Sequence, residues 1–327
     1  MKLLPLILLF ISHLAFAIPE QNFETNWKEK VHPYFQSMTE DTFENSQGLR
    51  IKFFYLAHPE NTKTLIIVPG RTEPALKYAE LIYDFRNLGY DFFILDHQGQ
   101  GESERLLSDS HKGHVINFSD YIQDFSQFYD KVRKIKKNQT THLIAHSMGG
   151  AIAVKFMSQI QWGVNKAVLI APMLKLNTKP YSEFVARIFS KFLVATGKGD
   201  QYAPDYGPYI PEEDVFETNS YTHSEGRFNI SKYIFTNWPH LALGGPTARW
   251  VHESLKATKS IHKLPFVTPV LLFQSGKDEI VKNDRQNAFC RKFCKLILLP
   301  EAKHEILMEK DEIRDVAIKE IKSFFGI

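Results

Sequence analysis

A serine placed at a sharp turn is the strongest chemical signal in this sequence. Ser147 lies in the run Leu-Ile-Ala-His-Ser-Met-Gly-Gly, residues 143–150, between an apolar segment and a segment with helical spacing. A nucleophile elbow needs small residues two positions before and after the serine, and Ala145 and Gly149 meet that need, although glycine is usual at the first. A serine that only caps a helix is the alternative. The small residues around Ser147, after a buried strand, favour a nucleophile.

A nucleophilic serine needs a base, and the base needs an acid that orients it. With a nucleophile elbow the chain order is serine, then Asp or Glu, then His. Asp278 follows a predicted strand that ends at Gln274, and His304 follows one that ends at Leu299. Open α/β sheets bind ligands at the carboxyl ends of their strands. We therefore predict His304 as the base and Asp278 as its acid.

Two neighbouring acids compete with Asp278, and one further histidine adjoins the serine. Glu279 would point away from the site if Asp278 points into it, and Asp284 falls within the next predicted helix. His146 adjoins the serine in sequence but points away from it on a turn of this kind. We therefore interpret His146 as structural support.

Attack by the serine on an ester creates an oxyanion, which needs two N–H donors. We predict the backbone N–H of Met148 as the first donor and that of Arg71, after the predicted strand 64–68, as the second. Gly70 allows the backbone to approach closely. Pro69-Gly70 alone would indicate an ordinary turn, but beside the elbow it indicates an oxyanion loop.

The elements that must position these residues alternate between strand and helix. Short apolar runs predict strands, and apolar residues at helical spacing predict helices. The predicted strands are 49–57, 64–68, 91–95, 141–145, 166–170, 269–274 and 295–299, and the predicted helices are 75–88, 118–135, 148–160, 248–259, 283–294 and 311–325. This alternation predicts an α/β fold with a mostly parallel central sheet flanked by helices. It breaks between residues 173 and 247, which predicts an insertion.

Length and composition set the domain organisation and exclude some classes of protein. The chain has 327 residues, of which 43% are hydrophobic and 24% charged, and its net charge of +3 is too small for a nucleic-acid-binding surface. We expect a signal peptide over 1–17, a first core part over 18–172, a helical cap over 173–247 and a second core part over 248–327. No motif indicates a metal or an organic cofactor.

The first 17 residues have the pattern of a secretory signal peptide. Lys2 precedes an apolar run from Leu3 to Ile11, which the cleavage pattern Ala15-Phe16-Ala17 follows. A retained membrane anchor is the alternative, but the run gives way at once to polar residues. Cleavage after Ala17 would mean that the protein is exported across the inner membrane to the periplasm or the extracellular medium.

Cys290 and Cys294 are the only cysteines in the sequence, and an oxidising compartment would allow them to pair. Their i, i+4 spacing within the predicted helix 283–294 puts both on one helical face, where a bridge across one turn is geometrically awkward. We therefore expect two partly buried thiols rather than a disulfide. Without further ligands of suitable spacing, the two cysteines do not predict a metal site.

Taken together, these residues resemble the serine-dependent α/β-hydrolase family, and within it the bacterial lysophospholipase and monoglyceride lipase branch. The resemblance covers roughly residues 40–325. Its motifs are Pro69-Gly70-Arg71-Thr72-Glu73, Lys77-Tyr78-Ala79-Glu80, residues 96–103 and 145–150, Gly244-Gly245-Pro246-Thr247 with Trp250-Val251, and His304-Glu305-Ile306-Leu307. The bacterial lysophospholipases look closest, because monoglyceride lipases usually carry His-Gly in place of Pro69-Gly70. The resemblance implies removal of the single acyl chain of a lysophospholipid, with Ser147, Asp278 and His304 as the catalytic triad.

The insertion gives an independent indication of the substrate. Five residues of the insertion fall on one face of a helix at helical spacing: Tyr181, Phe184, Ile188, Phe192 and Ala195. An amphipathic cap of this kind predicts an acyl-binding roof over the serine and a peripheral contact with a membrane surface. A stripe that only packs the cap onto the core is the alternative.

Three other functions share parts of this pattern. A monoacylglycerol lipase or general carboxylesterase would use the same triad, because a fold does not determine its substrate. An iminopeptidase would need acidic groups in the cap to hold a free amine, and Glu212, Glu213 and Asp214 offer them. A catalytically inactive acyl-binding homologue would keep only the fold, but the triad residue types at the predicted strand ends argue against it.

Overall fold

A central sheet organises the computed structural model, which describes residues 17–137, 140–160, 163–291 and 293–327. In this part of the chain the sheet has eight strands in the order β1-β2-β4-β3-β5-β6-β7-β8. The strands are β1 (Thr39–Glu44), β2 (Arg50–Leu56), β3 (Lys63–Val68), β4 (Tyr90–Leu95), β5 (Thr140–His146), β6 (Lys166–Ile170), β7 (Val270–Ser275) and β8 (Cys294–Leu299). β2 pairs antiparallel with β1 and β4, and the other pairs are parallel. The predicted, mostly parallel sheet is confirmed.

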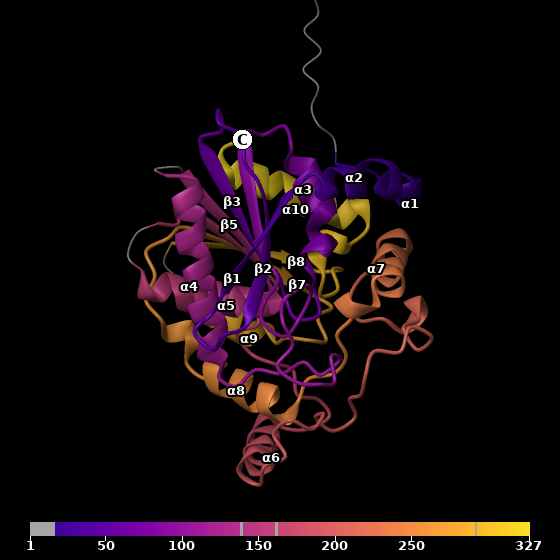
Figure 1. The fold of residues 1–327 in the computed structure, drawn as a ribbon, viewed down its shortest axis with the longest axis vertical. Helices are drawn as coiled ribbons and strands as arrows, with labels where there is room; N and C mark the ends of the chain where they lie inside the picture. The colour runs from indigo at the N-terminus through magenta and orange to yellow at the C-terminus, as the bar shows by residue number, and fades with distance from the viewer. Residues whose placement is uncertain (1–16, 138–139, 161–162, 292) are drawn as a thin grey trace, which may run out of the picture.

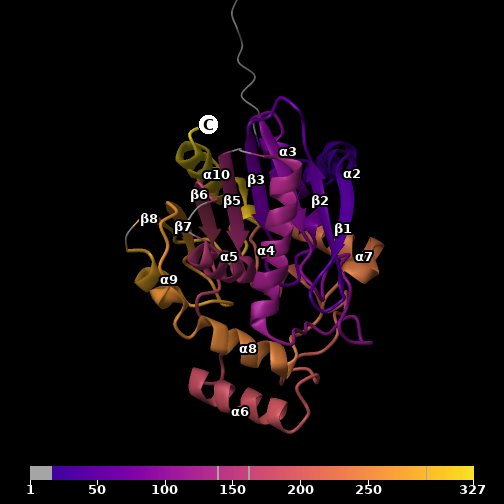
Figure 2. The ribbon, with the colours of Figure 1, turned by 60° about the vertical axis from the view of Figure 1, so that its left-hand side comes forward.

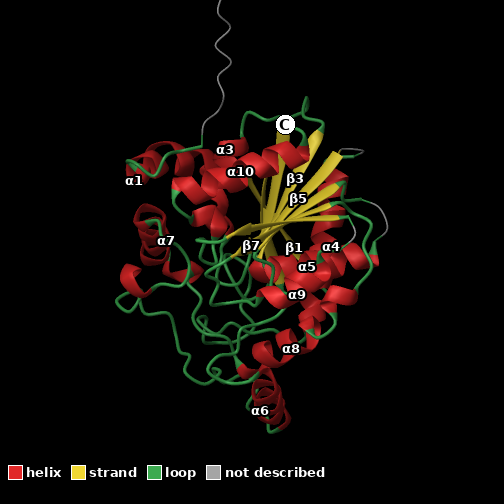
Figure 3. Cartoon of the chain, turned by 180° about the vertical axis from the view of Figure 1, so that it is seen from behind, coloured by secondary structure: helices red, strands yellow, loops and turns green. Residues whose placement is uncertain are grey.

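Helices cover both faces of this sheet (Figures 1 and 3). The α-helices are α1 (Phe23–Asn26), α2 (His32–Gln36), α3 (Ala79–Phe85), α4 (Phe118–Ile135), α5 (Ser147–Gln159), α6 (Glu183–Ala195), α7 (Glu225–Asn237), α8 (Ala248–Thr258), α9 (Asn283–Phe289) and α10 (Asp311–Phe325). The shorter helical turns are η1 (Trp27–Val31), η2 (Ala75–Tyr78), η3 (Phe216–Thr218), η4 (Pro239–Leu241), η5 (Ile261–Lys263) and η6 (Ile306–Met308). Helices α3 and α10 pack on one face, and α4, α5 and α9 on the other. None of the helices in the described ranges is long and apolar enough to cross a membrane.

Strand β3 shows why the central strands are apolar throughout. Its side chains alternate between the two cores: Leu65 and Ile67 pack in one, and Ile66 and Val68 in the other. All four are completely buried. A parallel strand covered on both faces needs apolar residues at every position, which explains the continuous apolar run in the sequence.

Residues 173–247 lead from the end of β6 towards α8 and carry α6 and α7. Helix α6 packs against α8 at one end of the molecule, away from the sheet (Figure 2). Helix α7 packs against α1 instead. The two helices of the insertion are thus attached to different parts of the core.

A buried ionic cluster attaches α7 to the core. Arg227, on α7, contacts Glu80 on α3 and Asp311 on α10, each at 2.9 Å. Arg314 contacts Asp84 at 2.7 Å and Glu80 at 3.3 Å. The side chains of both arginines are completely buried, so these contacts replace the hydration that the charges lose.

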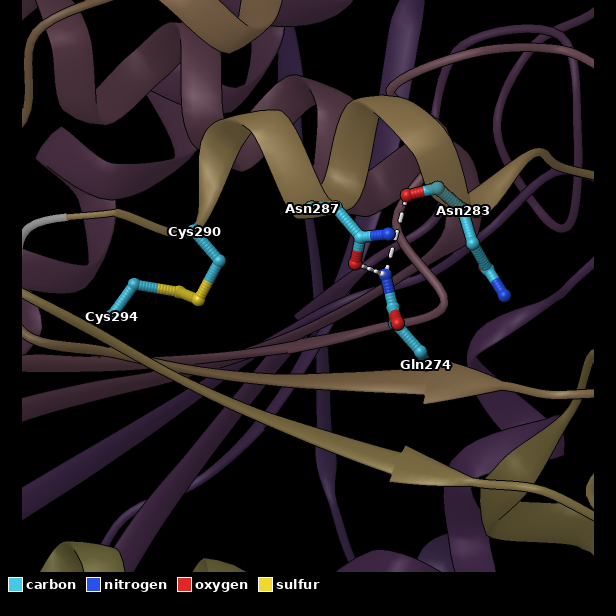
Figure 4. The surroundings of a disulfide bond; sticks show 5 residues. All are labelled: Gln274, Asn283, Asn287, Cys290 and Cys294. Carbon is cyan, nitrogen blue, oxygen red and sulfur yellow. Dashed lines mark hydrogen bonds between the residues drawn. A yellow bond between two sulfur atoms is a disulfide. The ribbon is translucent and has the colours of Figure 1, made fainter.

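The two cysteines correct our prediction. Helix α9 ends at Phe289 rather than Cys294, so Cys290 follows the helix and Cys294 begins β8, and the two do not share one helical face. Their Cα atoms are 5.1 Å apart, within the usual range for a bridge, and the two residues form a disulfide (Figure 4). The expectation of two separate thiols was wrong because it assumed that the helix continued.

The N-terminal part of the structure also differs from expectation. We predicted no element between residues 20 and 39, but α1, η1 and α2 lie there, and β1 follows from Thr39. The predicted helix 75–88 is a 3₁₀ turn, η2, followed by the shorter α3. The predicted signal peptide falls almost wholly on residues 1–16, which lie outside the described residues.

Candidate active site

Ser147 lies at the junction of β5 and α5 in a strained conformation. Its φ is 49°, in the left-handed region that residues with a side chain rarely adopt. Gly149, on the first turn of α5, packs against the main-chain carbonyl groups of Val68 and Pro69, where a Cβ would collide with them. The small residue two positions after the serine is therefore needed for close packing, as the sequence predicted.

His304 connects Ser147 to Asp278. Its Nε2 lies 2.9 Å from Ser147 Oγ, and its Nδ1 lies 2.8 Å from Asp278 Oδ2. The two partners of Ser147 follow β8 and β7, the strands that the sequence indicated. The structure therefore brings all three predicted residues into one hydrogen-bonded array.

The environment of Asp278 keeps it charged. Burial alone raises the pKa of its carboxyl group, but the positive charge and hydrogen bond of His304 outweigh burial, helped by the N–H groups of Ile280 and Val281. The pKa of Asp278 is therefore lower than usual. An ionised Asp278 holds the His304 ring with Nδ1 protonated, so that Nε2 can take a proton from Ser147.

The rival acids make other contacts. Glu279 Oε2 accepts a hydrogen bond from Ser220 Oγ at 2.8 Å, and Asp284 pairs with Lys175 at 2.5 Å. Neither is among the partners of His304 in the described structure. Among the three candidate acids, only Asp278 has the geometry to orient the base.

The two predicted oxyanion donors lie at the ends of neighbouring strands. Met148 is the second residue of α5, so its N–H belongs to the groups that the first helical turn leaves free. Arg71 follows β3, which pairs with β5 so that Val68 lies opposite Ala145. This pairing brings both residues to the same edge of the sheet as the serine. Their role as donors stays a prediction.

Glu73 is a residue of the site that our sequence analysis did not single out. Its carboxylate accepts hydrogen bonds from the N–H of Gly70, from the Tyr78 hydroxyl at 2.6 Å and from His146 Nδ1 at 2.8 Å. His146 Nε2 in turn donates to the carbonyl oxygen of His304 at 3.2 Å. The interpretation of His146 as structural support agrees with these contacts, which join the predicted oxyanion loop to the loop of the base.

A second buried pair lies beside this one. Lys77 Nζ is 2.6 Å from Glu305 Oε1, and their side chains are 7% and 9% exposed. Glu305 directly follows His304 in the chain, so the pair fixes the same loop from η2. In the sequence, the only indication of Glu73 and Glu305 is their position in the motifs that contain Gly70 and His304.

A cavity of about 810 Å³ adjoins Ser147 and His304. Helix α6 contributes Val185, Phe189 and Leu193 to its lining, and the core contributes Trp250. The stripe that we predicted as an acyl-binding roof was wrong in its residues, because only Tyr181 of that stripe lines the cavity. A volume of this size accommodates a small-molecule ligand. The lining is mostly apolar, so the cavity suits a substrate with an aliphatic part.

Comparisons with known proteins agree with this geometry. The model of the Hydrolase_4 family, described as serine aminopeptidase, S33, matches residues 59–311. A protein of Haemophilus influenzae named probable lysophospholipase L2 is 34% identical over 304 residues, which cover 90% of this chain and 94% of that protein. Lysophospholipase L2 of Escherichia coli K12 is 33% identical to this chain, and the alignment covers 90% of this chain and 89% of that protein.

A solved structure has the same fold. A soluble variant of monoglyceride lipase from Saccharomyces cerevisiae, in complex with a substrate analog, superposes with a TM-score of 0.68 at 17% sequence identity. The superposition covers 87% of this chain and 93% of that chain. At this identity the likeness concerns the fold, and it confirms the architecture expected from the sequence.

Proposed function

Because the chain belongs to the Hydrolase_4 (serine aminopeptidase, S33) family of α/β hydrolases, we propose that it is a serine carboxylester hydrolase that removes the acyl chain of lysophospholipids. The observation that carries this proposal is the hydrogen-bonded array of Ser147, His304 and Asp278 beside a largely apolar cavity. The names of the two bacterial relatives support the substrate.

In the proposed reaction Ser147 Oγ attacks the ester carbonyl carbon while His304 Nε2 takes the serine proton. The N–H groups of Arg71 and Met148 bind the oxyanion. The bond from the carbonyl carbon to the glycerol oxygen then breaks, and His304 gives its proton to the departing glycerophosphodiester. Water then loses a proton to His304 and attacks the acyl carbon. The bond from this carbon to Ser147 Oγ breaks, His304 returns the proton to Oγ, and the fatty acid leaves. Asp278 stabilises the imidazolium in both steps.

The insertion serves in this proposal as a cap over a core formed by residues 18–172 and 248–327. Its support is the cavity lining, to which α6 contributes Val185, Phe189 and Leu193. Apolar side chains at these positions suit the acyl chain. The acyl chain accordingly lies along α6, with its ester carbonyl at Ser147.

The outer face of α6 supports a peripheral contact with a lipid surface. Phe184, Ile188 and Phe192 are 71%, 53% and 58% exposed. Exposed lysines accompany them, among them Lys191 and Lys198, and would favour anionic lipids. Replacing Phe184 and Phe192 together by serine should reduce cosedimentation with vesicles of anionic phospholipid. Val316→Ser, which removes an exposed apolar group from α10, is the control, and equal binding by all three proteins would contradict the contact.

Export across the inner membrane completes the proposal and rests on the sequence of residues 1–17 alone. N-terminal sequencing of protein recovered from the periplasm or medium should give Ile18 as the first residue. Recovery only from the cytoplasm, with Met1 in place, would contradict it.

The activity is tested by measuring fatty-acid release from a lysophospholipid and a monoacylglycerol of equal chain length. Ser147→Ala should abolish release, and Ser158→Ala, near the other end of α5, is the matched control. A preference for the monoacylglycerol would favour the alternative, a monoacylglycerol lipase or general carboxylesterase. Failure of a fluorophosphonate to label Ser147 would favour an inactive acyl-binding homologue.

A further inference from the structure

The side chain of Arg71 lines the cavity without an anionic partner among the described residues. Its Nη2 donates to the carbonyl oxygen of Gly244, and its guanidinium carbon lies 5.3 Å from the ring centroid of Trp250. A Cβ on Gly113 would lie 2.5 Å from Nη2, so this glycine makes room for the guanidinium. The side chain is thus held in place by a carbonyl, a ring and a glycine, none of which neutralises its charge.

The carboxylates that line the same cavity are engaged elsewhere. Their partners are His146 for Glu73, Lys77 for Glu305, Tyr181 for Asp205 and Ser220 for Glu279. Arg71 Nε is buried and has no hydrogen-bond partner in the described structure. Burial lowers the pKa of the Arg71 guanidinium, and the titratable groups acting on it are tyrosines rather than carboxylates. A cation in such a place is stabilised by an anionic ligand.

We infer that Arg71 binds the phosphate of a phosphodiester head group, an inference that rests on the proposed function. In Arg71, a certain number of covalent bonds separates the main-chain nitrogen from the guanidinium carbon. In a 1-acyl lysophospholipid, the same number of bonds separates the ester carbonyl carbon from the phosphorus. One residue therefore reaches both the oxyanion, through its N–H, and the phosphate, through its guanidinium. The planar fork of arginine suits phosphate oxygens.

This assignment makes Arg71 a specificity residue. A monoacylglycerol has a hydroxyl group where the lysophospholipid has its phosphodiester, so its binding leaves the guanidinium unpaired. A site built for a charged group discriminates strongly against a ligand that lacks the group. Arg71 therefore favours the lysophospholipid over the monoacylglycerol.

The first test compares kcat/KM for 1-palmitoyl lysophosphatidylcholine and 1-monopalmitoylglycerol. Arg71→Gln keeps the main-chain N–H and should lower the ratio of the two values about tenfold to a hundredfold, whatever loss the two substrates share. Arg71→Lys keeps the charge but not the planar fork, so its ratio should lie between those of the unmodified protein and Arg71→Gln. Gly113→Ala, which displaces the guanidinium, should also lower the ratio. Lys179→Gln, another cation lining the cavity, is the control and should leave the ratio within about threefold.

The second test needs only basal esterase activity, measured with p-nitrophenyl butyrate. Glycerophosphocholine should inhibit the unmodified protein more strongly than glycerol or inorganic phosphate does, and Arg71→Gln should remove that advantage. Equal inhibition of both proteins, or equal losses on both lipids in the first test, would overturn the assignment. If inhibition depends on Arg71 but the lysophospholipid is not cleaved, the proposed function fails while the phosphate site stands.

A second inference comes from the residue that follows the predicted cleavage site. Ile18 is only 6% exposed, and its N–H donates to Asp84 Oδ1 at 3.2 Å. Its carbonyl oxygen accepts a hydrogen bond from Arg227 Nη2 at 3.2 Å. Ile18 is therefore part of the buried ionic cluster that joins α3, α7 and α10.

The charges of this cluster do not balance. Two cations, Arg227 and Arg314, form ion pairs with three anions, Glu80, Asp84 and Asp311, so one formal negative charge is left among the described residues that make these pairs. The structure assigns the missing positive charge to the α-ammonium group that cleavage after residue 17 creates, an assignment that rests on the proposed export. Removal of the leader then completes the cluster and stabilises the mature protein.

The test compares three proteins: a chain that begins at Ile18, the same chain acetylated at its N-terminus, and a chain that begins at Ala17. The first should have the highest Tm, by about 3 °C or more, because only there does the ammonium lie beside Asp84. Equal Tm values would overturn the assignment. Because these chains are prepared in vitro, the result is independent of whether the cell exports the protein, which N-terminal sequencing decides.

Discussion

The carboxylate of Glu73 offers the sharpest test of how the proposed catalytic loops are held together. It accepts hydrogen bonds from Gly70, Tyr78 and His146. The other ring nitrogen of His146 donates to the carbonyl oxygen of His304. Both ring nitrogens of His146 face acceptors, so both bonds form only when the ring is an imidazolium. Glu73→Gln keeps the size of the side chain and removes the charge that stabilises this imidazolium.

The expected magnitude follows from burial. The side chains of Glu73 and His146 are 5% and 6% exposed, so water screens their attraction little. Removing one partner of a buried ion pair destabilises a protein by about 3–5 kcal/mol. The amide still offers an acceptor, so we expect about 3 kcal/mol. We also expect kcat to fall about tenfold, because the carbonyl of His304 loses its donor, and the barrier then rises by about 1.4 kcal/mol.

Urea unfolding and p-nitrophenyl butyrate hydrolysis measure the two effects. The matched control is Glu102→Gln, whose carboxylate also pairs with a histidine, His240, but at the surface, where the side chains are 40% and 55% exposed. Such a pair contributes about 0–1 kcal/mol. Equal losses of stability in Glu73→Gln and Glu102→Gln, or an unchanged kcat in Glu73→Gln, would refute the reasoning.

Three further predictions concern single features of the structure. Asp278→Asn should lower kcat for p-nitrophenyl butyrate about 10⁴-fold in a folded protein, because the base loses its orientation. Burial lowers the pKa of His146, but the charge of Glu73 outweighs burial, so the pKa of His146 is raised. The loss of stability caused by His146→Gln should therefore be largest below about pH 6.5 and should shrink as the pH rises through the raised pKa. Urea unfolding at several pH values measures this loss. Replacing Cys290 and Cys294 by serine should lower the free energy of unfolding by about 2 kcal/mol, since the closed loop is short, and leave kcat unchanged.

Local signals in the sequence were enough for the elements that carry the array. Helices α4 (Phe118–Ile135) and α10 (Asp311–Phe325) and strand β6 (Lys166–Ile170) have the residue ranges that we predicted. Their apolar period and their ends depend on neighbouring residues only. The sharp turn at Ser147 is equally local, and the positions after β7 and β8 follow from the parallel order of the sheet.

Features that depend on distant partners could not be predicted in this way. Strand β1 has a single buried residue, Phe43, so it lacks the apolar alternation by which strands are recognised, and it exists because it pairs with β2. The contact between Glu73 and His146 joins residues 73 positions apart. The early end of α9 at Phe289 allows the disulfide that continued helical spacing would disfavour.

Head-group and acyl-chain recognition should be separable, because we assign them to residues of different elements. Arg71 is held by Gly244 and Trp250, whereas Phe189 reaches the cavity from α6. Substitutions at residues that share no partner and do not touch have additive effects. The changes in transition-state free energy caused by Arg71→Gln and Phe189→Ser, measured from kcat/KM for the lysophospholipid, should therefore sum in the double variant within about 0.5 kcal/mol. A larger deviation would mean that the two side chains act on the same part of the substrate, and the acyl chain would then not lie along α6.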